Sequence, residues 1–247
     1  MAQNNINLTY LKNIGVPIVE NSIQQEICNN LTKINQIITL RNQQLIELSN
    51  LVKSRFNEMF GDPVFNEMRW RRCKLKDISV EKLAYGSGAS AIDFSGLRYI
   101  RITDIDDVSR KFKEDSITSP DINVSECDNY LLCEKDILFA RTGASVGKTY
   151  LYDIKDGKVY FAGFLIRARI KDKFDSKFIF QNTLTDRFTQ YVKVTSQRSG
   201  QPGVNGKEYG EYELYLPKYE EQRAIGTYFS NLDNLINSHQ EKISQLE

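Results

Sequence analysis

A long heptad pattern near the start of the chain constrains its fold more than any other feature. Between residues 21 and 60 apolar side chains recur in alternating steps of four and three, which is typical of a coiled-coil helix. The positions are Ile27, Leu31, Ile34, Ile38, Leu45 and Leu48, with Arg41 at the polar break. Gly61 and Pro63 predict the end of the helix. At 1.5 Å per residue such a helix is roughly 60 Å long, so we interpret it as a spacer.

The same spacing returns at the end of the sequence. The matching residues are Ile225, Phe229, Leu232, Ile236, Ile243 and Leu246, at one constant offset (225 − 27 = 198), and His239 falls where Arg41 falls. Two unrelated amphipathic helices that share a period by chance are the alternative. The matched polar break favours an internal repeat. We expect Arg41 and His239 to form polar layers that fix the register of paired helices.

The region between the two helices predicts a mixed domain. Runs rich in aromatic and β-branched residues favour strands over 97–105, 136–141, 148–152, 158–170 and 211–216. Apolar residues at helical spacing over 175–195 predict a helix with Ile179, Phe180, Leu184, Phe188 and Tyr191 in the core. Residues 85–90 and 199–210 are expected to be loops rich in glycine. The expected fold class is α+β: a mixed α/β domain over 63–216, flanked by two long antiparallel coiled-coil helices over 21–62 and 217–247.

Composition argues against several classes of protein. The 33 Lys and Arg residues nearly balance the 32 Asp and Glu residues, so the global charge of +1 points to no partner. No apolar stretch follows a basic start, so we expect no signal peptide, and no apolar run is long enough to span a membrane. The four cysteines form no CxxC pair and the chain has one histidine. We therefore expect reduced thiols, a cytoplasmic location, and no metal site or cofactor.

Two catalytic motifs fit the sequence only loosely. The segment from Gly143 to Thr149 resembles a phosphate-binding loop, but it has three residues between its glycines where such a loop needs four. Asp136, Asp153 and Lys155 have the loose form of a metal-dependent nuclease, in which acids hold magnesium and a lysine lies near the attacking water. This pattern is common in a chain with so many acids and lysines. A nuclease that uses these three residues is the alternative function.

Two stretches of the central domain combine cations with small polar residues and contain no acids. They are residues 137–152 and 187–207. Glycine lets a backbone approach a ligand closely, Arg pairs with guanine, Asn and Gln pair with adenine, and Ser and Thr reach phosphates. Ordinary solvated loops are the alternative. The predicted DNA-contacting residues are Tyr85, Ser87, Arg101, Arg141, Thr142, Ser145, Lys148, Arg198, Ser199, Gln201, Asn205 and Lys207.

Four segments in the same order resemble the DNA-specificity subunits of type I restriction-modification systems. Residues 51–63 (LVKSRFNEMFGDP) are similar to the end of the spacer helix of that family. Residues 99–105 (YIRITDI) and 136–149 (DILFARTGASVGKT) resemble two strands of its target recognition domain and the loop after the second. Residues 200–205 (GQPGVN), followed by Leu216, Pro217 and the run 220–223 (EEQR), resemble the exit into the second helix.

The resemblance implies a non-catalytic subunit that reads a bipartite site in double-stranded DNA, while separate methyltransferase and restriction subunits modify or cleave it. A complete subunit of this kind has two target domains, whereas this chain has one. Residues 1–20 look like the tail of a missing first target domain, so the chain is either a half-length subunit or a fragment. We interpret it as a half-length form that pairs with a second copy of itself. The expected dimer and partner contacts are Ile27, Leu31, Ile34, Ile38, Arg41, Leu45, Leu48, Ile225, Phe229, Leu232, Ile236, His239 and Ile243.

Overall fold

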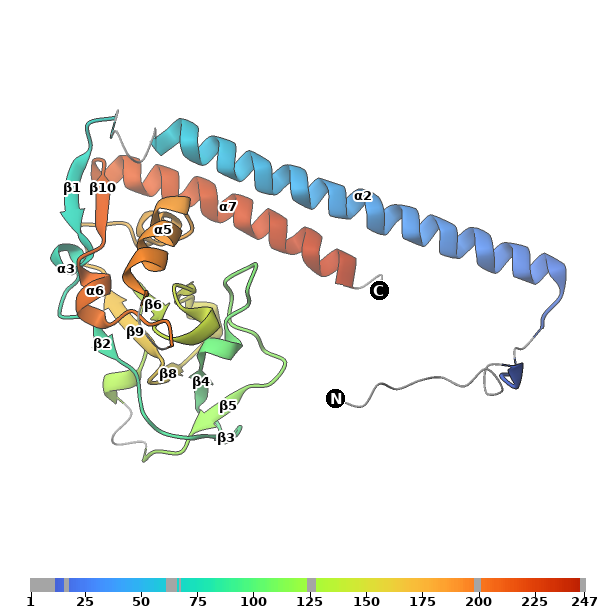
Figure 1. Cartoon of the computed structure of the whole chain (residues 1–247), viewed down its shortest axis with the longest axis horizontal. Coiled ribbons are helices and arrows are strands. Elements are labelled where there is room, and N and C mark those ends of the chain that lie inside the picture. Colours follow the sequence, from blue (N-terminus) through green and yellow to red (C-terminus); the bar gives the residue numbers. More distant parts are fainter. Residues whose placement is uncertain are drawn as a thin grey trace. The chain divides into compact units, whose positions relative to one another are not determined.

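The computed structural model of the chain describes residues 12–15, 18–60, 66, 68–123, 128–197 and 201–244. It divides into two units, residues 1–47 with 239–247, and residues 48–238. Helices α2 (Asn21–Phe60) and α7 (Tyr219–Ser244) each have residues in both units (Figure 1). Within the described part, no helix is both long and apolar enough to cross a bilayer. The described cysteines Cys28, Cys73 and Cys133 are free thiols.

The first unit contains most of helix α2, whose predicted bounds are confirmed. Several heptad positions remain open to solvent here: Ile27 is 47% exposed, Leu31 55% and Ile34 37%. Ile38, Arg41 and Leu45 are partly buried. An apolar stripe of this kind on a helix surface is covered in most soluble proteins, because burying it removes apolar area from water.

The second unit is a mixed α/β domain whose described strands form three sheets. One sheet pairs β1 (Arg71–Lys74) with β10 (Glu213–Leu216). A second has the order β2 (Ala84–Tyr85), β9 (Leu165–Arg169), β6 (Asp136–Ala140) and β7 (Thr149–Leu151). The third has the order β3 (Ala91–Asp93), β5 (Thr118–Pro120), β4 (Arg98–Ile100) and β8 (Val159–Phe161). Among the described strands, only β4 and β8 pair in parallel.

Strand β6 lies between two hydrophobic cores, which is why all five of its residues are buried. Ile137 and Phe139 belong to the core formed with the helices, while Leu138 and Ala140 belong to the core beneath the β3–β8 sheet. Successive side chains of a strand point to opposite faces, so a strand covered on both faces needs a continuous apolar run. The predicted strand 136–141 is therefore confirmed.

Three predicted elements are divided in the structure. The run 158–170, predicted as one strand, forms β8 and β9, because the chain turns at Gly163 and Phe164. The run 97–105 forms β4 and then the 3-10 helix η1 (Ile102–Asp104). The run 175–195 forms α4 (Ser176–Asn182) and α5 (Asp186–Thr195), because Thr185 caps a new helix by accepting from Phe188 N at 3.2 Å.

The connection between α4 and α5 also changes the predicted core. Leu184 lies in it and is 39% exposed, so its prediction as a core residue is wrong, whereas Ile179, Phe180 and Phe188 are buried as predicted. Tyr191 is partly buried against the same core. Residues 206–210, predicted as loop, form the short helix α6 (Gly206–Gly210).

The first half of α7 is part of the core of the domain. Ile225 is 3% exposed and Phe229 is fully buried, and both lie in one cluster with Phe178 and Ile179 of α4. Gln222 adds polar contacts, since its Oε1 accepts from Asp175 N at 3.1 Å and its Nε2 donates to Pro217 O at 2.9 Å. Ile225 and Phe229, which were predicted to contact a partner helix, therefore pack in the core of the chain's own domain.

We predict that Phe229→Ala lowers the free energy of unfolding by about 3–5 kcal/mol, because it removes a buried ring and leaves a cavity. Leu235→Ala on the same helix is the matched control, since Leu235 is 45% exposed, and it should cost no more than about 0.5 kcal/mol. Urea unfolding followed by circular dichroism measures both variants. Equal losses of stability would contradict the packing of α7 on the domain.

Candidate nucleic-acid interface

The two glycine-rich segments that were predicted to face DNA meet in the structure. Two backbone hydrogen bonds join them: Val204 N donates to Arg141 O at 2.9 Å and Gly143 N donates to Pro202 O at 3.1 Å. Together they form an antiparallel β-bridge between Thr142 and Gly203. Gly143 has a φ of 69°, a left-handed conformation that glycine adopts without strain. A Cβ atom at this position would lie 3.1 Å from Gln201 Nε2, so Gln201 sits directly beside the turn.

Arg141 and Tyr85 form the centre of this surface. The guanidinium carbon of Arg141 lies 5.1 Å from the centroid of the Tyr85 ring, which is a cation–π contact. Tyr85 is held in turn, since its hydroxyl accepts from Gly206 N at 2.9 Å. The guanidinium of Arg141 has no hydrogen bond or ion pair with any described residue, so its donors are free. A stacked arginine with free donors suits bidentate recognition of a planar acceptor pair such as guanine O6 and N7.

Helix α6 directly follows residues 201–205 of the second glycine-rich segment and fixes their end. Asn205 and Glu208 form a capping box, in which Asn205 Oδ1 accepts from Glu208 N at 2.9 Å and Glu208 Oε2 accepts from Asn205 N at 2.7 Å. Asn205 therefore acts as a helix cap, a role that occupies its side-chain oxygen. The hydroxyl of Tyr191 on α5 donates to Glu208 O. Lys207 on α6 is exposed.

The structure places three other predicted DNA contacts differently. Ser87 is 3% exposed, and its hydroxyl oxygen accepts from Ala89 N. Arg101 is engaged with Asp104, to which its Nε and Nη2 donate at 2.8 Å. Lys148 is 8% exposed, and its Nζ pairs with Asp107 and donates to Ile105 O at 3.2 Å. Lys148 is not the exposed cation that the loop composition suggested, because this pairing turns its charge inward.

The remaining predicted positions divide in two. Ser145 is partly buried in the 3-10 helix η4 (Gly143–Ser145), and its carbonyl accepts from Lys148 N at 2.9 Å. Arg198, Ser199 and the side chain of Ile243 lie outside the described residues. The structure thus brings together Tyr85, Arg141, Thr142, Gln201 and Asn205. Arg101 and Lys148 instead form ion pairs with Asp104 and Asp107.

Sequence reasoning missed one aromatic residue beside Arg141. Phe164 lies in the turn between β8 and β9 and is 58% exposed. Its carbonyl accepts from Arg141 N at 3.0 Å, so the turn and the Arg141 segment are fixed to each other. Gly163 within the apolar run was the available signal, since an isolated glycine in a strand pattern marks a bend or a close backbone approach.

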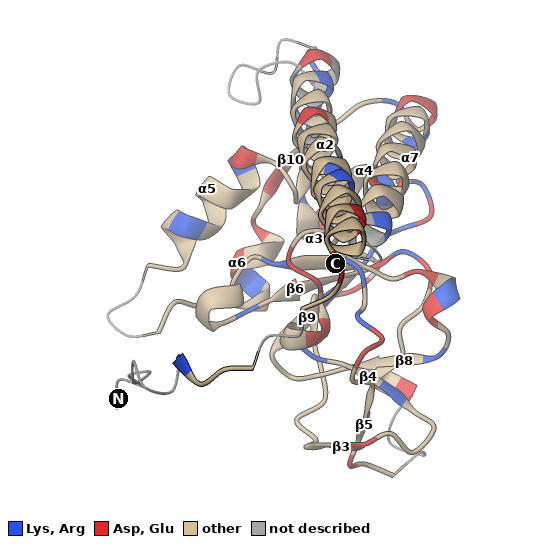
Figure 2. Ribbon diagram, turned by 90° about the vertical axis from the view of Figure 1, so that its right-hand side faces the viewer, with Lys and Arg blue, Asp and Glu red and all other residues tan. Residues whose placement is uncertain are grey.

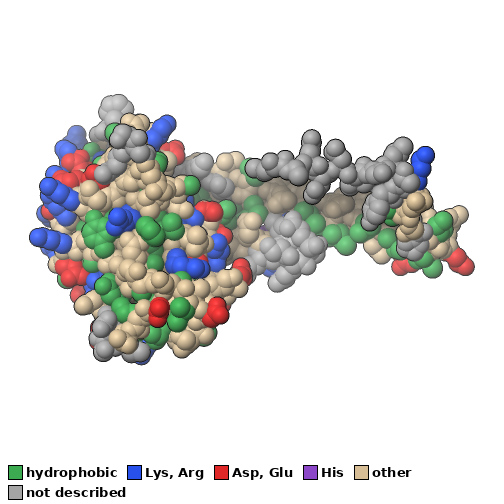
Figure 3. Space-filling view, turned by 60° about the horizontal axis from the view of Figure 1, so that its bottom comes forward, with side chains coloured by type: hydrophobic (Ala, Val, Ile, Leu, Met, Phe, Trp, Pro, Cys, Tyr) green, Lys and Arg blue, Asp and Glu red, His purple; other side chains and the backbone are tan. Residues whose placement is uncertain are grey.

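The charges of the domain are mixed rather than concentrated. In Figure 2 both basic and acidic positions occur in α5, α6 and the loops, and Figure 3 shows Lys, Arg, acidic and hydrophobic side chains intermixed on one face. Three of the four basic residues of β1 and α3 (Leu75–Ile78) form ion pairs: Arg72 with Glu213, and both Lys74 and Lys76 with Glu211. These lysines lower the pKa of Glu211 to about 2. Local free cations such as Arg141 and Lys207 therefore matter more than net charge.

The residues of the nuclease alternative do not form a metal site. Asp136 is fully buried, and its two oxygens accept from Arg169 Nε and Nη2 at 2.8 Å. Asp153 accepts from Lys155 N at 3.1 Å and caps the 3-10 helix η5 (Ile154–Asp156). Throughout the described residues, no group of three or more His, Cys, Asp or Glu side chains is arranged to hold a metal ion. Asp136 lacks the open carboxylate that magnesium binding requires.

Comparisons with known proteins show the family of this chain. The family model for the type I restriction modification DNA specificity domain matches residues 74–247, and the chain belongs to this family. The MjaVIII specificity subunit, a type I restriction enzyme subunit of Methanocaldococcus jannaschii, is 21% identical over 259 residues, which cover 96% of this chain and 59% of that protein. The chain therefore spans about three fifths of the length of this relative.

Solved structures share the fold. A type I restriction-modification S subunit from M. genitalium superposes with a TM-score of 0.65 at 15% identity, covering 98% of this chain and 62% of that one. The HsdS subunit from Thermoanaerobacter tengcongensis gives a TM-score of 0.56 at 15% identity, covering 90% of this chain and 53% of that one. At these identities the similarity concerns the mixed α/β fold.

We predict that Gly86→Ala disturbs the surface around Tyr85 and lowers the free energy of unfolding by about 1–3 kcal/mol, because the added methyl group would overlap the carbonyl of Ala162. Gly88→Ala is the matched control, since a Cβ there meets nothing within 4 Å. Thermal unfolding compares the two variants with the unchanged chain. A Gly86→Ala variant as stable as Gly88→Ala would contradict the close contact of these backbones.

Proposed function

We propose that this chain is the DNA-recognition subunit of a type I restriction-modification complex and that it has no catalytic activity of its own. The observation that carries the proposal is the Arg141 guanidinium, stacked on Tyr85 and without a partner in the described residues, beside Gln201. Membership of the specificity-domain family supports it. In this proposal the subunit works in the cytoplasm and directs methyltransferase and restriction subunits to a site that it selects.

In the proposed readout, neighbouring side chains contact different parts of the DNA. Arg141 and Gln201 contact base edges in the major groove, and Phe164 makes apolar contact with a thymine methyl group or the sugar. Lys207, exposed on α6, contacts the phosphate backbone. Because few free cations surround the site, its affinity for DNA alone is modest, and partner subunits contribute the rest.

We predict that Arg141→Ala in the assembled complex relaxes the requirement for one base in each half-site, at a cost of about 1–3 kcal/mol in binding. Lys207→Ala should leave the site unchanged but flatten the salt dependence of binding by about one unit. Lys218→Ala, which changes an exposed lysine at the start of α7, is the control and should alter neither. Methylome sequencing reads the site, and titrations at several salt concentrations give the slope. An unchanged site and unchanged affinity for Arg141→Ala would refute the proposal.

We further propose that the helices pair and that α2 also binds methyltransferase subunits. Both helices carry the heptad pattern, and in this proposal the parts of α2 and α7 beyond the domain core lie antiparallel. Exposed apolar side chains outside the main seam support a second contact: Ile37 is 42% exposed, Leu40 61% and Leu51 41%. A coiled-coil seam covers only its core positions, so these side chains remain available to a partner.

We predict that two copies of the chain form a two-fold dimer that reads a symmetric, bipartite site. An isologous pair presents two identical surfaces, so the half-sites must have the same sequence in opposite orientations. Light scattering at micromolar concentration should give about twice the mass of one chain, and the methylated motif should be a palindrome with an unspecified centre. A monomer together with an asymmetric motif would overturn the dimer and leave the recognition proposal standing.

A further inference from the structure

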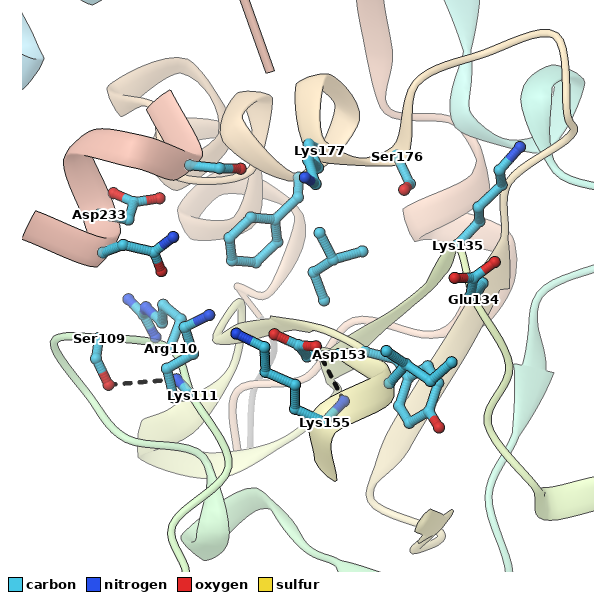
Figure 4. A pocket seen from close by; sticks show the side chains of 16 residues that line it. Ser109, Arg110, Lys111, Glu134, Lys135, Asp153, Lys155, Ser176, Lys177 and Asp233 are labelled. Atoms are coloured by element: carbon cyan, nitrogen blue, oxygen red, sulfur yellow. Dashed lines mark hydrogen bonds between the residues drawn. The ribbon is translucent and has the colours of Figure 1, made fainter. Parts of the chain in front are cut away.

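A cavity of about 460 Å³ lies in the second unit (Figure 4). Glu134 and Lys135 of its lining precede β6, whereas Arg141 follows the end of that strand. Its walls are the turn 109–111, the 3-10 helix η5, the start of α4 and the middle of α7. Residues just before β6 and just after β7 complete the lining. None of the residues that we assign to DNA recognition lines it. The volume falls within the range of small-molecule sites, about 300–1,000 Å³.

Cationic side chains dominate the lining of this cavity. They are Arg110, Lys111, Lys135, Lys155 and Lys177, against the acids Glu134, Asp153 and Asp233. Figure 4 shows these side chains around the same hollow. Lys135 pairs with Asp172 outside the lining, and the other four cations form no ion pair with any described residue.

Two of the three acids are already engaged. Asp153 accepts from the backbone of Lys155, and Asp233 accepts from Gln181 Nε2 at 2.7 Å. Burial also raises the pKa of Asp233, so its negative charge is disfavoured there. The lining keeps a formal excess of positive charge, five cations against three acids.

Arg110 is the strongest indication of a ligand. It is partly buried, and burial lowers the pKa of its guanidinium. The charges of Asp107 and Asp106 favour the charged guanidinium, but both carboxylates also have other partners: Asp106 Oδ1 accepts from Val108 N, Ser109 N and Ser109 Oγ, while Asp107 pairs with Lys148. No hydrogen bond joins the guanidinium to a described residue. The guanidinium is only partly buried, so its five N–H donors are open to an acceptor that enters the cavity.

We propose that this cavity binds a small molecule that carries phosphate groups. The planar fork of Arg110 matches two phosphate oxygens, and Lys111, Lys155 and Lys177 supply further charge for a ligand with more than one negative charge. Phe180 and Leu151 in the lining offer apolar contact to an organic portion. Walls on several sides favour a compact ligand over the convex backbone of a duplex. The assignment does not depend on the DNA-recognition proposal.

The test titrates pyrophosphate into the full-length chain by isothermal calorimetry. We expect saturable binding of one pyrophosphate per chain, weakened at least about tenfold by Arg110→Gly, because the charge-assisted bonds to the guanidinium are lost. Glycine is the chosen replacement because Arg110 has a φ of 58°, which glycine adopts without strain and so preserves the turn. Lys218→Ala removes one exposed charge elsewhere and should bind as the unchanged chain does.

Two results would overturn the assignment. Absence of saturable binding would do so, and so would equal binding by Arg110→Gly. A competition experiment with duplex DNA then distinguishes a small phosphate ligand from the DNA backbone. If pyrophosphate stays bound when DNA is added, the cavity is a small-molecule site. If DNA displaces pyrophosphate and Arg110→Gly also loses affinity for DNA, the small-molecule assignment is overturned in favour of contact with the DNA backbone. Methylome sequencing of Arg110→Gly should return the unchanged site, so failure of the cavity and failure of DNA recognition are distinguishable.

Discussion

The antiparallel pairing of β6 with β9 is the interaction on which the rest of this domain depends. Asp136 lies opposite Arg169 in the register, and the two side chains form a bidentate ion pair in which the carboxylate is fully buried. Loss of one partner from such a pair leaves an uncompensated buried charge, which typically costs about 3–5 kcal/mol. The pair fixes the start of a strand that separates two cores. The end of the same strand carries Arg141, so the position of the recognition surface follows from this register.

The periodic parts of the fold were predictable from the sequence, because the spacing of apolar residues along a helix or strand reflects which of its faces are buried. The heptad pattern gave the bounds of α2, and the unbroken apolar run of β6 reflects burial on both faces. The divided elements were not predictable from periodicity. The turn at Gly163 and Phe164 falls inside an apolar run, and the new cap at Thr185 falls inside a helical pattern. In both places a local hydrogen bond or close backbone contact overrides the longer pattern.

The candidate site shows a similar division. The acid-free composition of two loops predicted that Arg141, Thr142 and Gln201 face DNA, and the backbone pairing of residues 141–143 with 202–204 brings the two loops side by side. Composition could not distinguish free cations from paired ones. Lys148 sits in an acid-free segment, yet Asp107, which is distant in sequence, neutralises it. Arg101 lies three residues before Asp104 and pairs with it. Only the folded chain brings Asp107 to Lys148.

The burial of Ile225 and Phe229 also decides where this protein can be divided. Because the first half of α7 completes the core around α4, residue 217 is not a boundary between independent modules. A recombination joint placed there would separate the domain from side chains that fill its interior. A joint beyond residue 238 would transfer the domain with its own packing intact. Exchange of DNA specificity between related chains, by evolution or in the laboratory, is therefore expected to carry the first half of α7 along with the target domain.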